Sequence, residues 1–592
     1  MANRGESSVG ALSCWVVAAV FAAGIVHLVV NLRTVQVTGA ADYNYASSRQ
    51  SVRRVQTSGI RGRILGRDGE VLAGNRPSLS IVCLPSSFEK RSWSNTVGAI
   101  RRGIEKVGAE IGLRPVLSEK SISRHVSQSL ALPLFVWRDV GEREVAVFCE
   151  REREFPGFAV VETAERTYPC GALASHVVGY VGRDRGESQA GDEKFSYFTP
   201  EMRGRAGLES YYDGFLRGVP GERKLVVDAR GFAIRGWTVV DSQPGPDLVT
   251  TLDLRVQRAA ERQLRGERGA CVVMDPRNGE VLALASAPGF DLNAFVPVLS
   301  PSTYARYTDD PAKPLLNRAS GGAYAPGSTF KPVTALAALL SGYPPDEEYF
   351  CTGSFACGGM TLHCMSRWGH GPIDMRHALM KSCNPFFCNI ALDIGTNAFC
   401  AAAHSLGIGS RTGLDLGVDR AGVLPDGEWK MRTYGERWYP GDLAQMSIGQ
   451  GMLLATPLQM ARVAGAIGTG RLVTPHLRRD APVESKGLPF SDEQLQVVRD
   501  GMRMVIAGEG TVRGTGWRAG DGVGVSVSGK TGTAEVGVGE RRRKNAWFMA
   551  YAPSDAPTAA IALVVENGES GGVTAAPKAG EVLKAIFGGA GT

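Results

Sequence analysis

The sequence predicts an α/β (α+β) domain with an antiparallel sheet flanked by helices, preceded by a β-rich domain and one N-terminal transmembrane helix. Three observations predict this arrangement: an uncharged stretch near the N-terminus, short runs of Val and Ile over residues 34–240, and strand patterns at both ends of the remaining chain with helical patterns between them. With 592 residues, of which 43% are hydrophobic and 21% charged, the chain is long enough for two or more domains with hydrophobic cores.

The uncharged stretch, residues 10–32, is long enough to cross a bilayer as one helix. It is longer than the apolar part of a typical signal peptide, so we predict an anchor that follows a short tail of residues 1–9. Arginines lie on both sides of it, Arg4 before and Arg33 directly after, so the positive-inside rule does not orient it. No other segment predicts a membrane span.

The β-rich domain is predicted at residues 33–245. Residues 80–84 and 224–227 have strand patterns bounded by turn residues. No pair of carboxylates in this region indicates a glycosyltransferase. A polar segment rich in Pro and Gly, residues 241–247, interrupts the patterns, so we predict that the second domain occupies residues 246–592.

The second domain begins with a helical pattern over residues 256–264 and then a hairpin, in which residues 270–274 and 281–285 flank an Asn278-Gly279 turn. Near the C-terminus the sequence predicts three strands and a closing helix, at residues 525–533, 546–552, 559–566 and 578–587. Strands from both ends of a domain commonly pair in one sheet, which gives the predicted α/β architecture.

The overall charge of the chain limits the possible partners. A formal net charge of +7 is modest for this length and suits an anionic membrane surface or wall polymer. No basic stripe with interleaved aromatic residues occurs, so nucleic acid is not a predicted partner.

The first candidate catalytic motif is Ser328-Thr-Phe-Lys331. Pro332 fits a helix only in its first turn, which places the helix start close to Ser328 and puts Ser328 and Lys331 on one face. A serine hydroxyl needs an adjacent base to act as a nucleophile, and a desolvated lysine can be that base. Alone, the motif is equally compatible with an ordinary helix start.

The second motif is Ser382-Cys383-Asn384. The serine can relay a proton between the lysine and a leaving group, and the asparagine can hold a substrate amide. Because Ser and Asn are also common at helix caps and turns, this motif alone favours a structural role.

The third motif is Lys530-Thr531-Gly532-Thr533, which lies on a predicted strand. The lysine and the two hydroxyls would bind a substrate carboxylate, Gly532 allows close backbone approach, and a backbone N–H here could complete an oxyanion hole with that of Ser328. Residues 524–531 also match a phosphate-binding P-loop, but the alternating Val-Ser pattern predicts a strand where a P-loop needs a helix after the motif.

Together, Ser-x-x-Lys, Ser-x-Asn and Lys-Thr-Gly in this order form the signature of β-lactamases and penicillin-binding proteins. The chain resembles class B penicillin-binding proteins of the elongation type, the penicillin-binding protein 2 group. Besides the three motifs, the resemblance rests on segments in both domains, at residues 61–64, 67–75, 166–169, 176–182, 207–212, 447–451 and 455–461.

This resemblance implies a penicillin-recognising serine transpeptidase domain on a periplasmic pedestal, held in the bacterial cytoplasmic (inner) membrane by a single-pass anchor with a cytoplasmic tail. It implies cross-linking of peptidoglycan between D-Ala-D-Ala stem peptides during cell elongation, acylation by β-lactams, and a multi-spanning membrane glycosyltransferase as partner. Ser328 would be the nucleophile, Lys331 its base and Ser382 the proton shuttle. Substrate would be bound by Asn384, Lys530, Thr531, Gly532 and Thr533. The chemistry needs no cofactor.

Six of the eleven cysteines lie between Cys351 and Cys400. Cys351, Cys364, His370 and Cys383 are separated by twelve, five and twelve residues, and three thiolates with one imidazole suit tetrahedral structural zinc. Some members of the resembling family carry zinc in this region, with Asp where this chain has Cys351 and Cys364. Cys357 and His363 are possible substitute ligands, and disulfides involving Cys357 or Cys388, or plain buried thiols, are the alternatives.

Other functions with the same motifs remain open from the sequence. They are a division-type transpeptidase, a D,D-carboxypeptidase or β-lactamase that hydrolyses the acyl-enzyme, a β-lactam sensor, and a scaffold without catalysis. No glutamate-bearing deacylation motif accompanies Asn384, no additional span or cytoplasmic output domain indicates a sensor, and every catalytic residue type is present.

Overall fold

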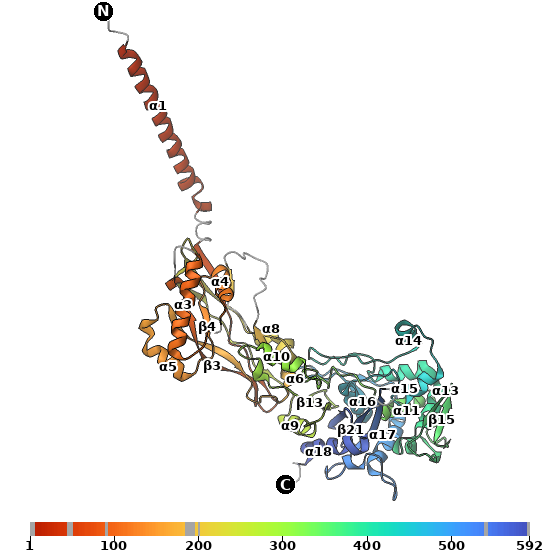
Figure 1. Ribbon diagram of the computed structural model, residues 1–592. Coiled ribbons are helices and arrows are strands. Elements are labelled where there is room, and N and C mark those ends of the chain that lie inside the picture. The colour runs from red at the N-terminus through yellow and green to blue at the C-terminus, as the bar shows by residue number, and fades with distance from the viewer. Residues whose placement is uncertain are drawn as a thin grey trace, which may run out of the picture.

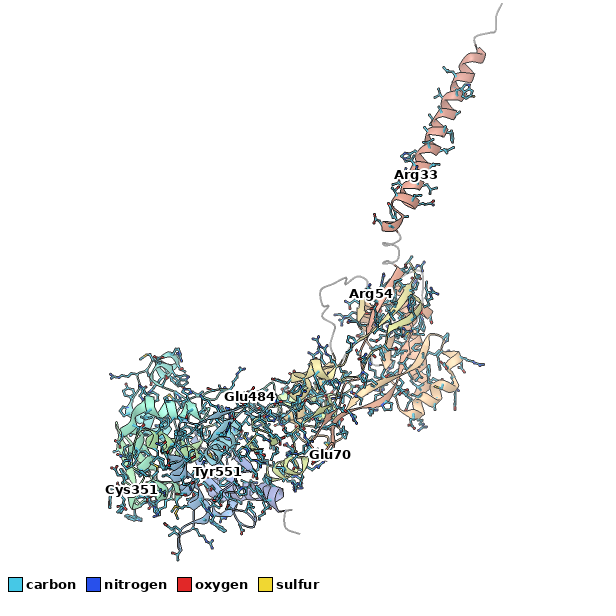
Figure 2. All side chains as sticks on the ribbon, turned by 180° about the vertical axis from the view of Figure 1, so that it is seen from behind. Arg33, Arg54, Glu70, Cys351, Glu484 and Tyr551 are labelled. Atoms are coloured by element: carbon cyan, nitrogen blue, oxygen red, sulfur yellow. The ribbon has the colours of Figure 1, made fainter. Side chains whose placement is uncertain are left out.

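The structure is a computed structural model that describes residues 6–43, 51–88, 93–115, 117–183, 196–198, 202–537 and 543–588. Figure 1 shows an elongated molecule in which helix α1 projects from a pedestal and the catalytic domain lies at the far end. In Figure 2, Arg54 marks the part of the pedestal next to the anchor and Cys351 the opposite end of the molecule.

The anchor is helix α1, Glu6–Arg33, followed by a π-helical turn η1, Thr34–Thr38. An 18-residue window within Leu12–Thr38 has a mean hydropathy of 2.3 and none of it is buried, as expected for a helix surrounded by lipid. Helix α13, Asn384–Ser405, is also long and apolar enough to span a membrane, but 44% of its most apolar window of 18 residues is buried inside the catalytic domain, which is typical of a core helix. Residues 1–5 of the predicted tail lie outside the described residues.

The pedestal contains two main sheets, with strand orders β10-β9-β1-β7 and β11-β2-β3-β4, and β5 pairs along β3. Its strands are β1 Val52–Thr57, β2 Ile64–Leu65, β3 Val71–Cys83, β4 Leu134–Trp137, β5 Phe158–Thr167, β6 Val181–Arg183, β7 Ser196–Phe198, β8 Met202–Gly204, β9 Gly221–Val227 and β10 Ala233–Val240. Strand β11, Leu248–Val249, lies just after the predicted domain boundary and joins the pedestal sheet by pairing with β2. Its helices and helical turns are η2 Pro85–Phe88, α3 Trp93–Ile111, α4 Glu119–Gln128, α5 Glu142–Glu150, η3 Glu152–Glu154, α6 Ser175–Val178, α7 Gly207–Tyr211 and α8 Asp213–Leu216. The two strands predicted in this region are confirmed within β3 and β9.

Helix α3 shows how the pedestal builds its core. Val97, Ile100, Ile104, Val107 and Ile111 recur every three or four residues and are all buried, so one face of the helix packs on the sheet that contains β3. Burial of a side chain of this size stabilises the fold by about 1.5–3 kcal/mol.

A buried ionic network joins the two halves of the pedestal. Arg61 donates to Glu209 (2.6 Å) and to Asp213 (2.8 Å), and Arg166 donates to the other oxygen of Glu209 (2.7 Å). The side chains of Arg61, Arg166 and Glu209 are 7%, 1% and 0% exposed. Each guanidinium group therefore has a carboxylate partner in the interior.

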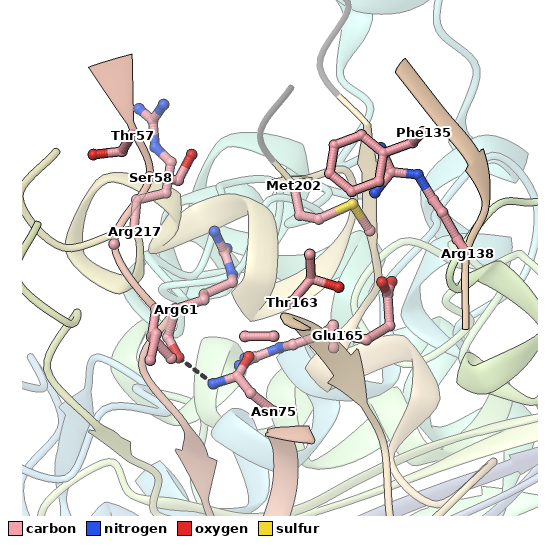
Figure 3. Close-up of a pocket in the computed structure, with 14 residues that line it drawn as sticks. Thr57, Ser58, Arg61, Asn75, Phe135, Arg138, Thr163, Glu165, Met202 and Arg217 are labelled. Atoms are coloured by element: carbon pink, nitrogen blue, oxygen red, sulfur yellow. Dashed lines mark hydrogen bonds between the residues drawn. The ribbon is translucent and has the colours of Figure 1, made fainter. Parts of the chain in front are cut away.

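A cavity of about 320 Å³ opens beside this network, between the end of β1 and the sheet of β3, β4 and β5 (Figure 3). Its lining includes Arg61, Asn75, Phe135, Arg138 and Thr163. It belongs to the pedestal and is far along the chain from all three catalytic motifs.

The catalytic domain is built on one five-stranded antiparallel sheet with the order β13-β12-β22-β21-β20. The strands are β12 Gly269–Met274, β13 Val281–Ala287, β20 Ser528–Val536, β21 Arg543–Ala552 and β22 Ala559–Val565. The predicted antiparallel sheet of strands from both ends of the domain is confirmed. Strand β20 begins three residues later than predicted, because Val525–Val527 belong to the preceding loop rather than to the ladder.

Helices cover both faces of this sheet (Figure 1). Alternate residues of β12 and β22 face opposite cores: Val272 and Val564 pack toward the side of α11 and α16, and Val273 and Leu563 toward the side of α9 and α18. Burial on both faces explains why these strands are apolar throughout rather than alternating.

The remaining elements of the catalytic domain carry the active site and its surroundings. They are α9 Leu254–Gln263, η4 Leu292–Phe295, α10 Pro301–Thr308, η5 Gly327–Phe330, α11 Lys331–Leu340, β14 Tyr349–Cys351, β15 Ser354–Cys357, β16 Met360–His363, β17 Gly371–Ile373, α12 Met375–Met380, α14 Gly427–Tyr434, α15 Pro440–Ser447, α16 Pro457–Thr469, β18 Arg471–Val473, β19 Ser485–Gly487, α17 Asp492–Ala507, η6 Trp517–Ala519, η8 Gly571–Ala575 and α18 Ala576–Phe587. The predicted first helix, hairpin and closing helix are confirmed as α9, β12–β13 and α18.

The two domains meet through apolar and polar contacts. Tyr180 of the pedestal stacks on Phe295 with 3.9 Å between the ring centroids, within a core that both domains share. Tyr212 in the pedestal donates to Asp415 (2.7 Å), which also accepts from the backbone N–H of Leu477 (2.6 Å). Arg67 pairs with Glu280 (3.2 Å) across the same junction. These contacts fix the pedestal to the sheet side of the catalytic domain.

Candidate active site

Ser328 and Lys331 lie at the start of a buried helix, as the sequence predicts. Ser328 is in the helical turn η5, and Lys331 opens α11 with Pro332 in the first turn. The side chain of Lys331 is completely buried, whereas Ser328 is half-buried and accessible to a ligand. The serine is therefore at the surface of the site and the lysine beneath it.

Ser382 and Asn384 lie in the turn between α12 and α13. Ser382 has a φ of 54°, which is uncommon for a residue other than glycine and stores strain at this point. Asn384 begins α13 with Pro385 behind it. The side-chain amide of Asn384 donates to the backbone carbonyl of His363 (2.7 Å), so the end of β16 holds the asparagine in place.

Lys331 joins this turn to the helix start that carries Ser328. Its ammonium donates to the backbone carbonyl (2.7 Å) and hydroxyl (3.2 Å) of Ser382 and to Oδ1 of Asn384 (2.6 Å). Burial lowers the pKa of Lys331 to about 8, because desolvation disfavours the charged form and no carboxylate lies within salt-bridge distance among the described residues. The amine can therefore lose its proton near physiological pH.

Lys530 approaches Ser382 from the opposite side. It is fully buried on β20 and donates to the hydroxyl of Ser382 (3.0 Å) and to the carbonyl of Thr531 (3.0 Å). Burial, and next the neighbouring charge of Lys331, lower the pKa of Lys530. Two lysines thus converge on one hydroxyl, which gives a path for a proton across the site.

Glycines allow strand β20 to lie against the turn that carries Ser328. A Cβ on Gly532 would lie 2.9 Å from the carbonyl oxygen of Pro326 and 3.0 Å from the N–H nitrogen of Thr329. A Cβ on Gly327 would lie 2.7 Å from the carbonyl oxygen of Thr533. Only glycine fits at these two contacts, so backbone N–H groups of both segments can reach one reacting atom.

The hydroxyls of Thr531 and Thr533 have partners that the sequence did not indicate. Thr531 donates to the hydroxyl of Thr515 (3.0 Å), and Thr533 accepts from the backbone N–H of Gly571 (3.3 Å). Gln450 donates to the carbonyl of Thr533 (3.3 Å). Gln450 lies in a segment that carries the family resemblance, but Thr515 has no local signal in its sequence.

The P-loop alternative for residues 524–531 is wrong. Lys530 and Thr531 lie in the middle of β20 and pair with Met549 and Phe548 of β21, and the strand continues to Val536. A P-loop needs a helix directly after the lysine, and a strand stands there instead.

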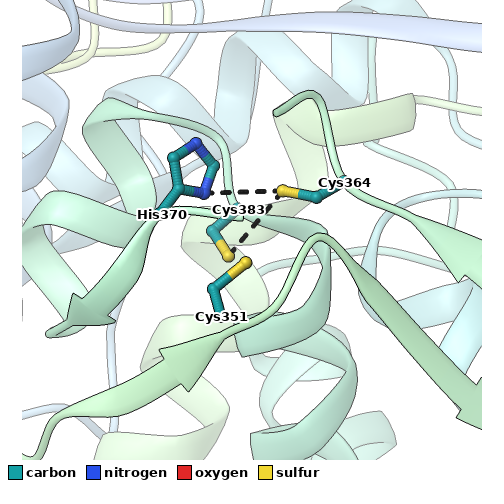
Figure 4. A group of neighbouring side chains, drawn as sticks. All are labelled: Cys351, Cys364, His370 and Cys383. Carbon is teal, nitrogen blue, oxygen red and sulfur yellow. Dashed lines mark hydrogen bonds between the residues drawn. The ribbon is translucent and has the colours of Figure 1, made fainter. Parts of the chain in front are cut away.

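Cys351, Cys364, His370 and Cys383 come together in a cluster (Figure 4). Their ligand atoms all lie within 4.8 Å of one another, with 4.0 Å between the sulfurs of Cys364 and Cys383 and 3.5 Å between Sγ of Cys364 and Nδ1 of His370. Two Zn–S bonds of about 2.3 Å at a tetrahedral angle place their sulfurs about 3.8 Å apart, so the donor set and its spacing fit zinc.

Cys364 and Cys383 respond to their mutual hydrogen bond in opposite ways. This bond, and next the one to His370, lower the pKa of Cys364 against its burial, whereas the same bond and burial raise the pKa of Cys383, so Cys364 is the thiolate of the pair. All eleven cysteines are free thiols, so the disulfide alternative for Cys357 or Cys388 is wrong for this structure. His363 faces Ser354 across the β15–β16 hairpin, and neither His363 nor Cys357 belongs to the cluster.

Family comparisons agree with this architecture. The family model described as the penicillin binding protein transpeptidase domain matches residues 269–587, and the model of the penicillin-binding protein dimerisation domain matches residues 56–250. The chain belongs to the class B penicillin-binding proteins, in the elongation-type group of penicillin-binding protein 2. It is accordingly a serine-type peptidoglycan D,D-transpeptidase that binds penicillin.

Individual relatives show the same similarity over almost the whole chain. The peptidoglycan D,D-transpeptidase MrdA of Escherichia coli K12 is 31% identical over 95% of this chain and 91% of its own length. MrdA of Acinetobacter baumannii is 32% identical over 92% of this chain and 82% of its own length.

Solved structures extend the similarity to three dimensions. The penicillin-binding protein PBP2 of Helicobacter pylori, in complex with MreC, superposes with a TM-score of 0.79 at 28% identity and covers 91% of this chain and 99% of its own. A structure titled as a peptidoglycan synthase complex that coordinates polymerisation and cross-linking superposes with a TM-score of 0.71 at 29% identity and covers 99% of both chains.

Proposed function

We propose that Ser328 is the nucleophile with which this transpeptidase cross-links D-Ala-D-Ala stem peptides, and that Lys331 is its general base. The observation that carries the proposal is the convergence of two buried lysines, Lys331 and Lys530, on the hydroxyl of Ser382, with no carboxylate of the described residues in a salt bridge with either. A buried amine without a counter-ion is a base that can act near neutral pH.

The reaction follows from this arrangement. Ser328 Oγ attacks the carbonyl carbon of the penultimate D-Ala, and its proton passes to the neutral amine of Lys331. The C–N bond to the terminal D-Ala breaks, and the leaving amine takes a proton relayed through Ser382. The amine of a second stem peptide then attacks the acyl-enzyme, forms the cross-link and restores the proton to Ser328.

Binding of the substrate is assigned to the surrounding residues. Asn384 would hold the peptide amide, and Lys530, Thr531 and Thr533 would bind the terminal carboxylate. Backbone N–H groups of Ser328 and of β20 would receive the developing oxyanion, and the close approach at Gly532 supports this role.

Labelling with a fluorescent penicillin tests the nucleophile directly. Wild type should be labelled covalently, and Ser328→Ala should not be labelled although it keeps the wild-type thermal unfolding midpoint. Equal labelling of the two proteins would exclude Ser328. Separation of cross-linked stem peptides from free D-Ala without cross-links then distinguishes a transpeptidase from a carboxypeptidase.

A structural zinc ion is proposed at Cys351, Cys364, His370 and Cys383. The spacing of the four donors and their chemistry, three thiols and one imidazole, support it. Because Cys383 stands between Ser382 and Asn384, a metal there would hold the turn that carries the proton relay. The purified protein should contain about one zinc per chain, and Cys364→Ser should lose it together with activity; a metal-free, fully active preparation would exclude the site.

The chain is proposed to sit in the cytoplasmic membrane through α1, with residues 33–245 as a pedestal and residues 246–592 as the catalytic domain in the periplasm. The complexes of related proteins, one with MreC and one that combines polymerisation with cross-linking, support a membrane glycosyltransferase as partner. Co-purification from detergent-solubilised membranes, with α1 intact and with α1 replaced by an unrelated span, tests whether the anchor is part of that interface.

A further inference from the structure

Thr515 lies behind the strand that carries the Lys-Thr-Gly motif. Its hydroxyl accepts a hydrogen bond from Thr531 (3.0 Å) and donates one to the carbonyl of Met380, at a distance of 3.5 Å. Met380 ends α12, directly before the turn of Ser382. Thr515 therefore contacts both sides of the active site, strand β20 and the α12–α13 turn, although 16 residues separate it from Thr531.

The backbone around Thr515 is closely packed. A Cβ on Gly514 would lie 2.1 Å from the carbonyl oxygen of Val505, and the N–H of Gly516 donates to that same carbonyl (2.9 Å). Glu509, at the start of this loop, accepts from His377 on α12 (2.8 Å). Since the loop is held to α17 on both sides of Thr515 and to α12 at Glu509, the hydroxyl has a defined position.

The number of hydrogen bonds that the hydroxyls of Thr515 and Thr531 can donate and accept indicates a role for Thr515. Each hydroxyl has one proton to donate and can accept two hydrogen bonds. Without a ligand, Thr531 gives its proton to Thr515. A carboxylate accepts protons only, so Thr531 must turn its proton toward the carboxylate in order to bind it.

We propose that Thr515 is a positioning residue for carboxylate recognition, which turns its own hydroxyl proton to Thr531 when Thr531 donates to the substrate. The direction of the hydrogen bond between the two hydroxyls reverses, while their separation stays the same. Thr515 gives up only its long bond to Met380, since 3.5 Å is well beyond the usual O–H···O distance of about 2.7–2.8 Å. Donation from Thr515 polarises Thr531 and strengthens its bond to the carboxylate.

This inference rests on the proposed role of Thr531 in carboxylate binding and adds Thr515 as a residue that acts through Thr531. A purely structural role for Thr515 would affect every ligand alike. The positioning role affects only ligands that carry a carboxylate, so a matched pair of ligands separates the two.

The test compares benzylpenicillin with its methyl ester, which lacks the free carboxylate. Second-order acylation rate constants for both are measured by competition with a fluorescent penicillin, and the ratio of acid to ester is the readout. Thr515→Val, which removes the hydroxyl and keeps the shape, should lower this ratio by about tenfold, in line with the loss of one hydrogen bond to the Thr531 hydroxyl that itself binds the carboxylate. Thr515→Ser, which restores a hydroxyl, should return the ratio close to that of wild type.

Two control variants make the result interpretable. Thr334→Val removes a buried hydroxyl from α11 that donates to the carbonyl of Ser447 (2.7 Å) and does not touch β20, so its acid-to-ester ratio should match that of wild type. Thr531→Val should lower the ratio at least as much as Thr515→Val.

The outcomes are distinguishable. If Thr531→Val lowers the ratio and Thr515→Val slows both ligands equally or leaves the ratio unchanged, the role of Thr515 is overturned and that of Thr531 stands. If Thr531→Val leaves the ratio unchanged, both assignments are overturned. Thr515→Val with a lowered ratio and Thr515→Ser with a restored one support the proposal.

Discussion

The pedestal and the catalytic site both bury cations, but they differ in the groups that bind these cations. In the pedestal, Arg61 and Arg166 share the carboxylate of Glu209, and Asp213 provides a second partner for Arg61. In the catalytic site, Lys331 and Lys530 are equally buried, and their hydrogen bonds go to hydroxyl, carbonyl and amide oxygens.

This difference decides what each group can do. Burial lowers the pKa of Arg61, but Glu209 and Asp213 outweigh it and the pKa is raised, so this cation is permanently charged. Burial lowers the pKa of Lys331 to about 8 and outweighs the nearby cysteines, Cys383 first, which raise it; no carboxylate of the described part of the chain forms a salt bridge with this amine. A buried cation that has a carboxylate partner keeps its proton and connects two segments of the chain. A buried amine without such a partner can lose its proton and act as a base.

The largest expected effect is on catalysis. Lys331→Met should slow acylation by fluorescent penicillin by about 10²–10⁴-fold, because Ser328 loses its base. The same change should lower the free energy of unfolding by less than a broken buried ion pair does, because relief of the desolvated amine partly offsets the loss of its hydrogen bonds to Ser382 and Asn384. A marked loss of stability in a denaturant titration would show that Lys331 is structural after all.

In the pedestal, removal of a charged partner should reduce stability. Glu209→Gln leaves two buried guanidinium groups without their shared carboxylate and should lower the free energy of unfolding by about 3–5 kcal/mol. Glu222→Gln is the matched control, because its pair with Arg54 is long (3.8 Å) and Arg54 is 70% exposed. Equal unfolding midpoints for the two variants in guanidinium chloride would contradict the comparison.

The smallest expected effect concerns His377, a partly exposed side chain that has carboxylate partners. Burial lowers its pKa, but hydrogen bonds to Asp374 (2.6 Å) and Glu509 (2.8 Å) outweigh burial and raise the pKa above 6.5. A raised pKa means that the folded state holds the proton more tightly, so the stabilisation is complete below pH 6.5 and is lost as the pH rises through the raised value. His377→Gln should therefore lower the unfolding midpoint at pH 5.5 more than at pH 8.5.

Much of the catalytic domain could be predicted from the sequence, because its signals are local. Alternation and turn residues indicate the strands, and Pro332 after Ser328 indicates the helix start. The gathering of Cys351, Cys364, His370 and Cys383 could be predicted from residue types, since Cys and His have few other reasons to recur in one segment.

The non-local contacts could not be predicted. Glu209 meets Arg61 across 148 residues, and Thr515 meets a strand whose own sequence gives no hint of a partner. The positive φ of Ser382 is imposed by the contacts around the turn, since serine has no local preference for it. The position of a hydroxyl or carboxylate inside a fold depends on tertiary packing, which no short pattern encodes.

The pH dependence of acylation tests the central claim most directly, namely that Lys331 is a neutral base because it is buried without a carboxylate. The second-order rate constant for fluorescent penicillin is measured on the wild-type protein from pH 6 to pH 9.5, within the range in which its fold is stable. It should rise by about tenfold per pH unit at first and level off near the pKa of Lys331, which is about 8. A rate constant that stays flat across this range would contradict the account, because the base would then not lose a proton where its environment requires it.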